Sequence, residues 1–348
     1  DAIVKTLQHP TVASKSFLIT IGDRTVGGMV ARDQFIGPFQ VPVSDYSLCL
    51  RSFTSLKGEV MSIGEKSTLA VTNPEASLRM AMGEALTNMA SVVIKGLDHV
   101  QVSANWMAAS GDPKQDSALR NGVEALSKIS VDLEVSIPVG KDSLSMRTKW
   151  NEEKNEYEVT SPLSGIISAM APVDDVSHSV TPELNVDEDS VILMVKINQK
   201  NRLAGSIFSE VTESKYTETP DIDDVKLFKS LFNHIQKLIK DNKILAMHDI
   251  SDGGLVTALA EMCFTKKVGM NIQVDDIDSI NKTLFSEEIG FVIQVKSDEL
   301  DIVKSSLDEI NIYVEEVAII AEESFSILSK EKEVFSESIT VLEKYWRE

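Results

Sequence analysis

The stretch "HVQVSANW" (residues 99–106), with "DPKQDSALRNGVEALSKIS" (112–130) and "VSIPVG" (135–140) after it, decides the fold class. The first and last segments have the composition of strands. The middle segment repeats Leu119, Val123 and Leu126 at helical spacing. A strand, a helix and another strand in succession indicate helices layered on a sheet. The sequence therefore predicts a mixed α/β (α+β) fold.

The same alternation continues on both sides of this stretch. Upstream, "FLITIG" (17–22) predicts a strand before a loop rich in glycine and proline, and Pro74 opens a helix that we expect to end at Gly96. Downstream, the polar segment 148–160 predicts a hairpin tip, and "SPLSGIISAMAPV" (161–173) predicts a buried strand.

A change of composition after this strand predicts a domain boundary. Residues 174–189, "DDVSHSVTPELNVDED", are acidic, contain Pro182 and have few large apolar side chains. We expect two domains, residues 1–178 and 179–348. In the second domain the patterns predict helices at 224–243, 255–262 and 297–310, and strands at 190–197, 244–250, 269–277, 289–296 and 312–323.

The composition limits the classes of partner. The chain has 348 residues, and 54 acidic against 34 basic residues leave a net charge of -20. This charge repels nucleic acids and anionic membranes, so neither is expected as a partner. Only Cys49 and Cys263 are present, which argues against a disulfide framework and favours a reducing cytosol. No segment approaches the roughly 20 apolar residues of a membrane span. Because the chain opens on Asp1, we expect a piece of a longer polypeptide.

The segment "HDISDGGLVTALAEM" (248–262) is the first candidate site. Ser251 precedes a predicted helix and can accept hydrogen bonds from its first amides. Gly253 and Gly254 would leave free N–H groups at the positive end of the helix dipole, which suits phosphate. A plain helix start explains the same letters.

Three further motifs carry polar side chains. Glu84 and Asn88 in "GEALTN" are four residues apart, so both emerge from one helix face and offer the hard oxygens that Mg²⁺ prefers. An ordinary solvated face is the alternative. Asp45 in "VPVSDY" ends an apolar stretch and could be a turn residue. "PVGKDSLSM" (138–146) follows a strand and could grip phosphate or form a surface turn. The histidines lack a Ser or Cys partner at a telling spacing, so we interpret His248 as a structural or surface residue and expect it not to be a catalytic base.

In combination, these motifs resemble one enzyme family. This chain contains, in this order, "TIGDRTVGGMVARDQ", "GPFQVPVSD", "GEALTN", "SANWMAA", "IPVGKDSLSM" and "HDISDGG". The set closely resembles the large phosphoribosylformylglycinamidine synthase (FGAM synthetase) of bacterial purine biosynthesis. The resemblance covers nearly the whole chain. It indicates the second half of the synthetase region, without the glutaminase domain.

The resemblance implies a fold and an activity. The family's synthetase region has two similar halves, each with a larger domain that contributes strands to a shared barrel and a smaller α+β domain, which would correspond to residues 1–178 and 179–348. The enzyme is a cytoplasmic ATP-dependent ligase that converts formylglycinamide ribonucleotide to the amidine with ammonia from glutamine. Its partners here would be the remaining synthetase half and the glutaminase domain of the same chain. The isolated piece would be inactive and prone to self-association.

The resemblance also implies roles for single residues. One of the family's two nucleotide sites is structural and holds ATP or ADP with Mg²⁺. The implied magnesium ligands are Asp45, Glu84, Asn88 and Asp249, and the implied nucleotide contacts are Ser44, Ser251 and Lys15. The implied contributions to the active site are Gly140, Lys141, Ser143 and Asn105. Small relatives have Asn where this chain has Lys141, and no catalytic acid or base is expected in this chain.

Two other functions stay open at this point. The chain could be a nucleotide-holding module whose role is only to complete a barrel and scaffold its neighbour. It could also be a stand-alone synthetase or kinase of the same fold, such as aminoimidazole ribonucleotide synthetase.

Overall fold

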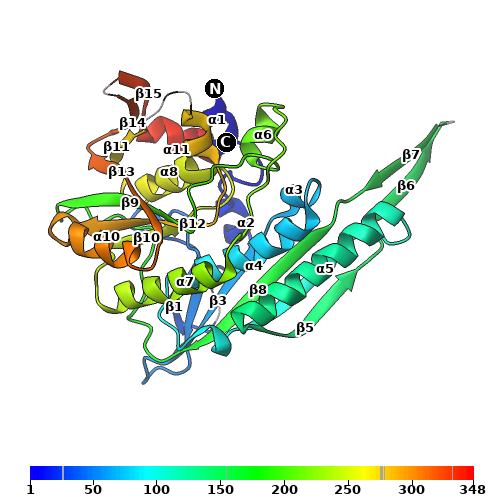
Figure 1. Cartoon of the computed structure of the whole chain (residues 1–348), viewed down its shortest axis with the longest axis horizontal. Coiled ribbons are helices and arrows are strands. Elements are labelled where there is room, and N and C mark those ends of the chain that lie inside the picture. The colour runs from blue at the N-terminus through cyan, green and yellow to red at the C-terminus, as the bar shows by residue number, and fades with distance from the viewer. Residues whose placement is uncertain (26, 154, 275–276, 278, 331) are drawn as a thin grey trace.

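A computed structural model describes all residues except 26, 154, 275–276, 278 and 331. Its first sheet has the order β1-β2-β3-β8-β4-β5, and only β4 and β5 pair in parallel. The strands are β1 (Val30–Arg32), β2 (Ser47–Leu50), β3 (Gly58–Glu65), β8 (Ser164–Val173), β4 (Gln101–Met107) and β5 (Ser136–Ser143). The mixed α/β fold is thereby confirmed (Figure 1).

Helices α4 (Pro74–Ala90) and α5 (Pro113–Leu133) cover one face of this sheet. Each begins at a side-chain cap, Asn73 or Asp112, followed by proline. Gly64 lets α4 approach β3 closely, because a Cβ there would lie 2.2 Å from the Ala81 carbonyl oxygen. The predicted helix from Pro74 ends at Ala90, before the expected Gly96, since the backbone N–H groups of residues 92 and 93 bond outside a regular helix.

The opposite face of the first sheet is not covered by the described residues of this chain. Along β3 the burial alternates, so that Met61 and Ile63 point outward with 41% and 59% exposure. Met170 on neighbouring β8 is 41% exposed. Beyond this sheet, β6 (Arg147–Glu152) and β7 (Asn155–Thr160) form the predicted hairpin, which extends away from the body (Figure 1). Its Trp150 and Tyr157 rings stack at 5.4 Å.

The second sheet has the order β10-β12-β9-β13-β11-β14-β15. Its strands are β10 (Ala246–Asp249), β12 (Gly290–Lys296), β9 (Ser190–Lys196), β13 (Tyr313–Ala321), β11 (Gly269–Gln273), β14 (Ser324–Ser329) and β15 (Lys332–Ser338). The strand predicted over 269–277 is described to Gln273, and residues 275–276 lie outside the described part of the chain.

Helices lie on both faces of the second sheet. α7 (Val225–Lys240) and α10 (Leu300–Asp308) share a hydrophobic core with α4, α5 and the first sheet. α8 (Gly254–Lys266), α11 (Ile339–Arg347) and α1 (Ala2–Leu7) pack on the other face. The remaining short helices are α3 (Ser67–Ala70), α6 (Ile207–Val211) and α9 (Ile280–Phe285). Because Ile3 and Leu7 belong to the core of the second sheet, packing crosses residue 178, and the division at 178/179 stays a prediction.

The strand predicted at "FLITIG" is wrong. Residues 16–20 form the short helix α2 (Ser16–Thr20), and Ile21 is 84% exposed. The segment has no neighbouring strand among the described residues, so its backbone groups bond locally, as Ile19 N–H does to the Lys15 carbonyl. Its apolar side chains suit either element, and periodicity could not separate the two.

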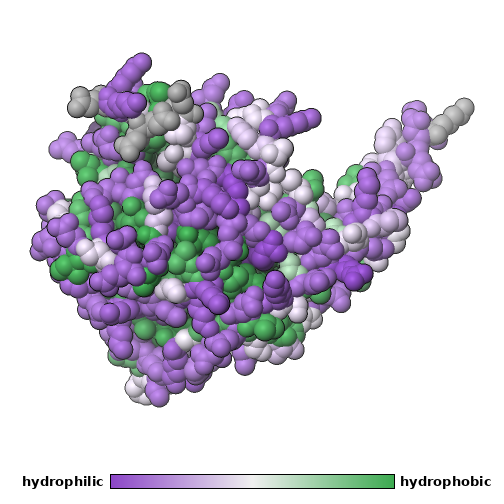
Figure 2. Space-filling model, viewed as in Figure 1, coloured by the Kyte–Doolittle hydropathy of each residue, from purple (hydrophilic) through white to green (hydrophobic). Residues whose placement is uncertain are grey.

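The surface agrees with the composition. Hydrophilic residues cover most of the face in Figure 2, in keeping with the net charge of -20. Among the helices that the structure describes, none is long and apolar enough to cross a membrane.

Candidate functional site

A cavity of about 450 Å³ lies between β2, β3, α4 and the loop that joins β10 to α8. Six of the residues selected from the sequence line it, namely Ser44, Asp45, Glu84, Asn88, Asp249 and Ser251. They come from segments as far apart as residue 44 and residue 251. We call this space the acidic cavity.

Helix α4 presents two side chains to the acidic cavity. Between Met80 and Ala90, Glu84 and Asn88 are the only residues that are not buried. The Glu65 amide donates to Glu84 Oε2 at 2.6 Å, and Asn88 Nδ2 donates to the Ile63 carbonyl oxygen at 2.9 Å. The end of β3 thus orients both side chains toward the cavity, and the alternative of a plain solvated face is not what the structure shows.

The opposite wall is formed by Asp45, His248 and Asp249. The side chains of Asp45 and Asp249 are only 2% and 7% exposed. His248 Nδ1 lies 2.7 Å from Asp45 Oδ1, and its Nε2 lies 2.9 Å from Glu261 Oε2. His248 is therefore a buried, paired residue and not a surface one. The Oδ2 atoms of Asp45 and Asp249 are enclosed without any hydrogen-bond partner among the described residues.

The electrostatics of this wall follow from burial. Burial raises the pKa of Asp249 well above its usual value, and the charge of Asp45 raises it further. Burial raises the pKa of Glu84 to about 7, although Lys66 opposes the change. Burial alone would lower the pKa of His248, but Asp45 and Glu261 raise it well above its usual value. The carboxyl groups of the acidic cavity thus outnumber the positively charged side chains that lie beside them.

Lys66 is a buried lysine beside these carboxylates. Its side chain is 3% exposed, and its Nζ lies 2.5 Å from Asp252 Oδ1, 3.2 Å from Ser251 Oγ and 3.8 Å from Glu84 Oε1. Sequence reasoning missed Lys66, since a lone lysine after a strand gives no signal of its own. Glu261 was missed as well, because a single glutamate within a helix gives no signal of its own either.

The start of α8 differs from the prediction. The Gly253 amide donates to Glu287 Oε1 at 2.9 Å, and the Gly254 amide donates to the Ser251 carbonyl oxygen at 3.0 Å. A Cβ on Gly254, which has a φ of +72°, would lie 2.7 Å from the Phe285 carbonyl carbon. These glycines therefore serve a tight turn and close packing, and the expected free amides for phosphate are wrong. Ser251 is also not a helix cap, because its hydroxyl donates to Glu84.

The residues of the acidic cavity fit a divalent cation. Carboxylate and amide oxygens form a hard donor set of the kind that Mg²⁺ and Ca²⁺ prefer. Ligand atoms of Asp45, His248 and Asp249 lie within 4.8 Å of one another. Buried carboxylate oxygens without partners cost several kcal/mol, roughly, unless a cation compensates them. The enclosed Oδ2 atoms of Asp45 and Asp249 are the observation that a bound cation would explain.

Lys15 does not line the acidic cavity. Its Nζ donates to the backbone carbonyl of Thr11 at 3.3 Å and to that of Ala13. Burial lowers the pKa of Lys15, while the charges of Glu261 and Asp252 raise it, so the lysine lies near these two acids.

The remaining selected residues lie on the far strands of the first sheet. Asn105 in β4 pairs with Lys141 in β5, and Lys141 Nζ donates to Ser143 Oγ at 2.5 Å. Gly140 is needed where β5 meets β4, since a Cβ would lie 2.5 Å from the Ala104 carbonyl oxygen. Gly140, Lys141 and Ser143 are part of the largely exposed strand β5, and the turn interpretation of "PVGKDSLSM" is wrong up to Ser143. None of them lines the acidic cavity.

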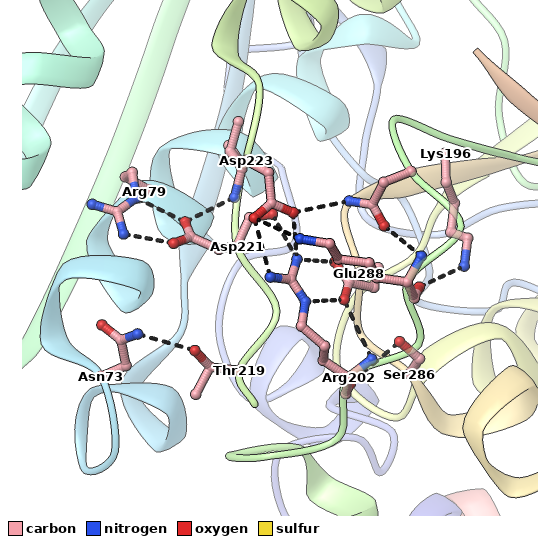
Figure 3. A network of polar contacts seen from close by, with 12 residues as sticks. Asn73, Arg79, Lys196, Arg202, Thr219, Asp221, Asp223, Ser286 and Glu288 are labelled. Carbon is pink, nitrogen blue, oxygen red and sulfur yellow. Dashed lines mark hydrogen bonds and ion pairs between the residues drawn. The ribbon is translucent and has the colours of Figure 1, made fainter. Parts of the chain in front are cut away.

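A polar network holds α4 against the second sheet (Figure 3). Arg79 on α4 makes two hydrogen bonds to Asp221 at 2.7 and 2.6 Å, and Asn73 bonds to Thr219 at 3.0 Å. Arg202 binds Glu288, which is fully buried just before β12, at 2.5 and 2.7 Å. The network thereby ties the helix that carries Glu84 to the strand that pairs with the Asp249 strand.

Comparisons with known proteins identify both halves of this architecture. Residues 14–172 match the FGAR-AT PurM_N-like domain, and residues 187–328 match the C-terminal domain of AIR synthase related proteins. The chain therefore consists of PurM-like N- and C-terminal domains in the AIR synthase-like fold.

Solved structures agree with this fold. T. maritima PurL complexed with FGAR matches with a TM-score of 0.65 and 11% identity over 86% of this chain and 46% of that chain. Phosphoribosylformylglycinamidine synthase II from Thermotoga maritima matches with a TM-score of 0.65 and 10% identity over 89% of this chain and 47% of that chain. Thiamine-monophosphate kinase from Stenotrophomonas maltophilia has a TM-score of 0.55 and 12% identity over 87% of this chain and 93% of that chain. At these identities the likeness concerns the fold, and the chain spans about half the length of these two T. maritima proteins.

Proposed function

We propose that the acidic cavity holds a magnesium–nucleotide complex, with Asp45, Glu84, Asn88 and Asp249 as the cation ligands. The observation that carries the proposal is the convergence of these four oxygen donors on one cavity, with two buried carboxylate oxygens that have no partner among the described residues. The cation would supply the positive charge that lets the carboxylates and a polyphosphate share one site. Ser44 and Ser251 line the cavity and would contact the nucleotide, ATP or ADP. Lys15 would also contact the nucleotide, although it does not line the acidic cavity.

The nucleotide phosphates would depend on the cation for binding. The N-terminus of α8, which often binds phosphate in other proteins, is occupied here by the carboxylate of Glu287. Lys66 is already engaged by Asp252. The structure thus favours a site in which the cation contributes most of the positive charge near the phosphates.

We further propose that the chain is one half of the synthetase region of an FGAM synthetase in purine biosynthesis. The whole protein would be an ATP-dependent ligase that uses glutamine-derived ammonia, and this half would hold a structural nucleotide. The domain matches and the coverage of about half of each T. maritima chain support this division. The uncovered face of the first sheet, with Met61 and Ile63, would pair with the remaining half.

The strands β4 and β5 would contribute to an active site that the remaining half completes. Gly140, Lys141 and Ser143 lie on an exposed strand, and Asn105 is beside them, so a second protein surface can reach all four. The general acid and base would come from the other half. The chain alone would then have no turnover.

Cation binding and turnover test the two parts separately. Titration of Mn²⁺ followed by electron paramagnetic resonance should show saturable binding. Asp249→Asn should weaken this binding by at least about tenfold, since even the loss of a residue that only hydrogen-bonds to a metal ligand typically lowers metal affinity about tenfold or more. Asp241→Asn, at an exposed position after α7, is the matched control. If Asp249→Asn binds Mn²⁺ like the unchanged protein, the cation site is wrong. Formation of product from ammonia, ATP and formylglycinamide ribonucleotide by the chain alone would refute the proposed division.

The second candidate function is a stand-alone synthetase or kinase of the same fold. The observation that favours it is the 93% coverage of the thiamine-monophosphate kinase, which shows that a complete enzyme of this fold can have this length. Phosphoryl transfer from ATP to a small acceptor by the purified chain would support this candidate. The absence of any ATP turnover together with retention of the nucleotide would favour the synthetase half.

A further inference from the structure

Arg32, the last residue of β1, is a partly buried arginine that forms no ion pair with the described residues. Its Nε is enclosed and lacks a hydrogen-bond partner among them. Arg120 is exposed on α5, and the other arginines pair with carboxylates: Arg24, Arg51, Arg79, Arg147, Arg202 and Arg347. The guanidinium of Arg32 hydrogen-bonds to the hydroxyl of Tyr46. In a chain with 54 acidic and 34 basic residues, a partly desolvated guanidinium that pairs with no carboxylate is unexpected.

The carboxylates close to Arg32 are engaged elsewhere or exposed. Asp33 is near enough for the charge of Arg32 to lower its pKa, although burial opposes this, but its Oδ2 accepts from Arg24 Nε at 2.6 Å. Glu183 is paired with Lys266 at 2.6 Å. Asp187 is exposed to solvent. Apart from its hydrogen bond to Tyr46, the guanidinium therefore keeps donors for a ligand, the Nε–H among them.

A cavity of about 280 Å³ lies beside Arg32. It is lined by Lys266 at the end of α8 and by the segment that connects the two sheets. That segment contributes the polar side chains of Ser179, Thr181 and Asn185 and the acidic side chains of Glu183 and Asp187. We call it the junction pocket. It shares no lining residue with the acidic cavity.

The junction pocket is held in shape from both sides. Val180 N–H donates to the Ser91 carbonyl oxygen at 2.9 Å, and the Tyr46 hydroxyl donates to the Val180 carbonyl oxygen at 2.8 Å. On the other side, Met247 N–H donates to the Thr181 carbonyl oxygen at 3.0 Å. The connecting segment is therefore fixed to both sheets, and a ligand would meet a preformed wall.

We propose that the junction pocket binds a small phosphate-type oxyanion, either free phosphate or the phosphate group of a small monoester. Arginine presents a planar fork of donors that matches a phosphate with two parallel hydrogen bonds. The hydroxyl of Thr181 borders the same space, and so does Lys266, whose ammonium pairs with Glu183 at 2.6 Å. The volume of about 280 Å³ lies below the roughly 300–1,000 Å³ of pockets for drug-sized ligands, which favours a small anion. A bound anion would connect β1, the segment between the sheets and α8.

Calorimetric titration with inorganic phosphate tests the proposal, at constant ionic strength and in the presence of EDTA, so that no divalent cation draws phosphate into the acidic cavity. A second titration uses glycerol 3-phosphate. We expect saturable binding in at least one of the two. Tighter binding of glycerol 3-phosphate assigns the pocket to a monoester, and equal or weaker binding assigns it to free phosphate.

Substitutions locate the binding. Arg32→Gln should weaken it by about tenfold or more, because a charge-assisted hydrogen bond is lost. Arg32→Lys keeps the charge and should weaken it less, so this variant also serves if Arg32→Gln does not fold. Arg120→Gln is the matched control and should bind like the unchanged protein. The proposal is overturned if neither anion binds saturably, or if both Arg32 variants bind as tightly as the control.

Discussion

The substitution Glu84→Gln measures directly how much free energy the acidic cavity stores without a cation. Burial raises the pKa of Glu84 from 4.5 to about 7. The folded protein therefore binds this proton more tightly than the unfolded chain, and its stability falls as the pH rises from 4.5 toward 7. The change of pKa corresponds to roughly 3 kcal/mol of lost stability above pH 7. Glutamine has no charge to desolvate, and its amide oxygen can still accept from the Glu65 amide.

The assay is urea unfolding in EDTA at several pH values between 5 and 8, with the free energy of unfolding extrapolated to water. We expect Glu84→Gln to be more stable than the unchanged protein by up to about 3 kcal/mol at pH 8, and the difference to shrink toward pH 5. The group faces Lys66, Asp252 and Ser251, and the charge of Lys66 lowers its pKa whereas the charge of Asp252 raises it. Glu124→Gln, at an exposed position on α5, is the control and should show no such trend.

Addition of Mg²⁺ should reverse the order of stability, so that the unchanged protein becomes more stable than Glu84→Gln. If Glu84 is a cation ligand, Mg²⁺ should stabilise the unchanged protein more than Glu84→Gln. A stability difference that stays constant from pH 5 to pH 8 would refute the reasoning, because it would show that Glu84 carries no cost of ionisation in the folded state.

Three further predictions concern the scaffold. Gly254→Ala should destabilise the protein by about 2–4 kcal/mol in urea unfolding, because the residue has a φ of +72° and a Cβ would lie 2.7 Å from the Phe285 carbonyl carbon; an unchanged midpoint would contradict this. Trp150→Ala should change the free energy of unfolding by less than about 0.5 kcal/mol, because the hairpin is a separate two-stranded sheet; a loss of more than 1 kcal/mol, roughly, would show that the arm supports the core. The chain should self-associate through the open face of the first sheet in sedimentation runs at increasing concentration, and Ile63→Glu should reduce this; a monomer at all concentrations would speak against an interface there.

Local patterns predicted much of the secondary structure. Helical spacing identified α5 and α7, and Pro74 marked the start of α4. The structure adds a side-chain N-cap to each of these helices, Asn73, Asp112 and Asp224. The same spacing placed Glu84 and Asn88 on one face. "FLITIG" failed because five apolar or small residues fit a strand or a helix equally well, and only the absence of a neighbouring strand among the described residues decides.

The composition of the site could be predicted only in part. Asp45, Glu84 and Asp249 stand in motifs that carry a local signal, whereas Lys66, Glu261 and Glu287 become neighbours of the site through long-range packing. The prediction about Gly253 and Gly254 failed for the same reason. A helix does follow these glycines, but the Gly253 amide donates to the carboxyl group of Glu287, a residue more than thirty positions away.

The polar network and the acidic cavity act on the same interface between the two sheets. Arg79 and Glu84 lie on α4, whereas Glu288 precedes β12, whose Phe291 pairs with Asp249 in β10. A cation that requires Glu84 and Asp249 together therefore binds only when the two sheets keep the orientation that the network holds. Binding to this arrangement alone adds about 2.7 kcal/mol at a ligand concentration 100 times the dissociation constant. In the absence of a cation, repulsion among the carboxylates opposes the same arrangement, and Arg79, Arg202 and Lys66 must hold it. This balance is consistent with a nucleotide site whose role is to set the geometry of the scaffold.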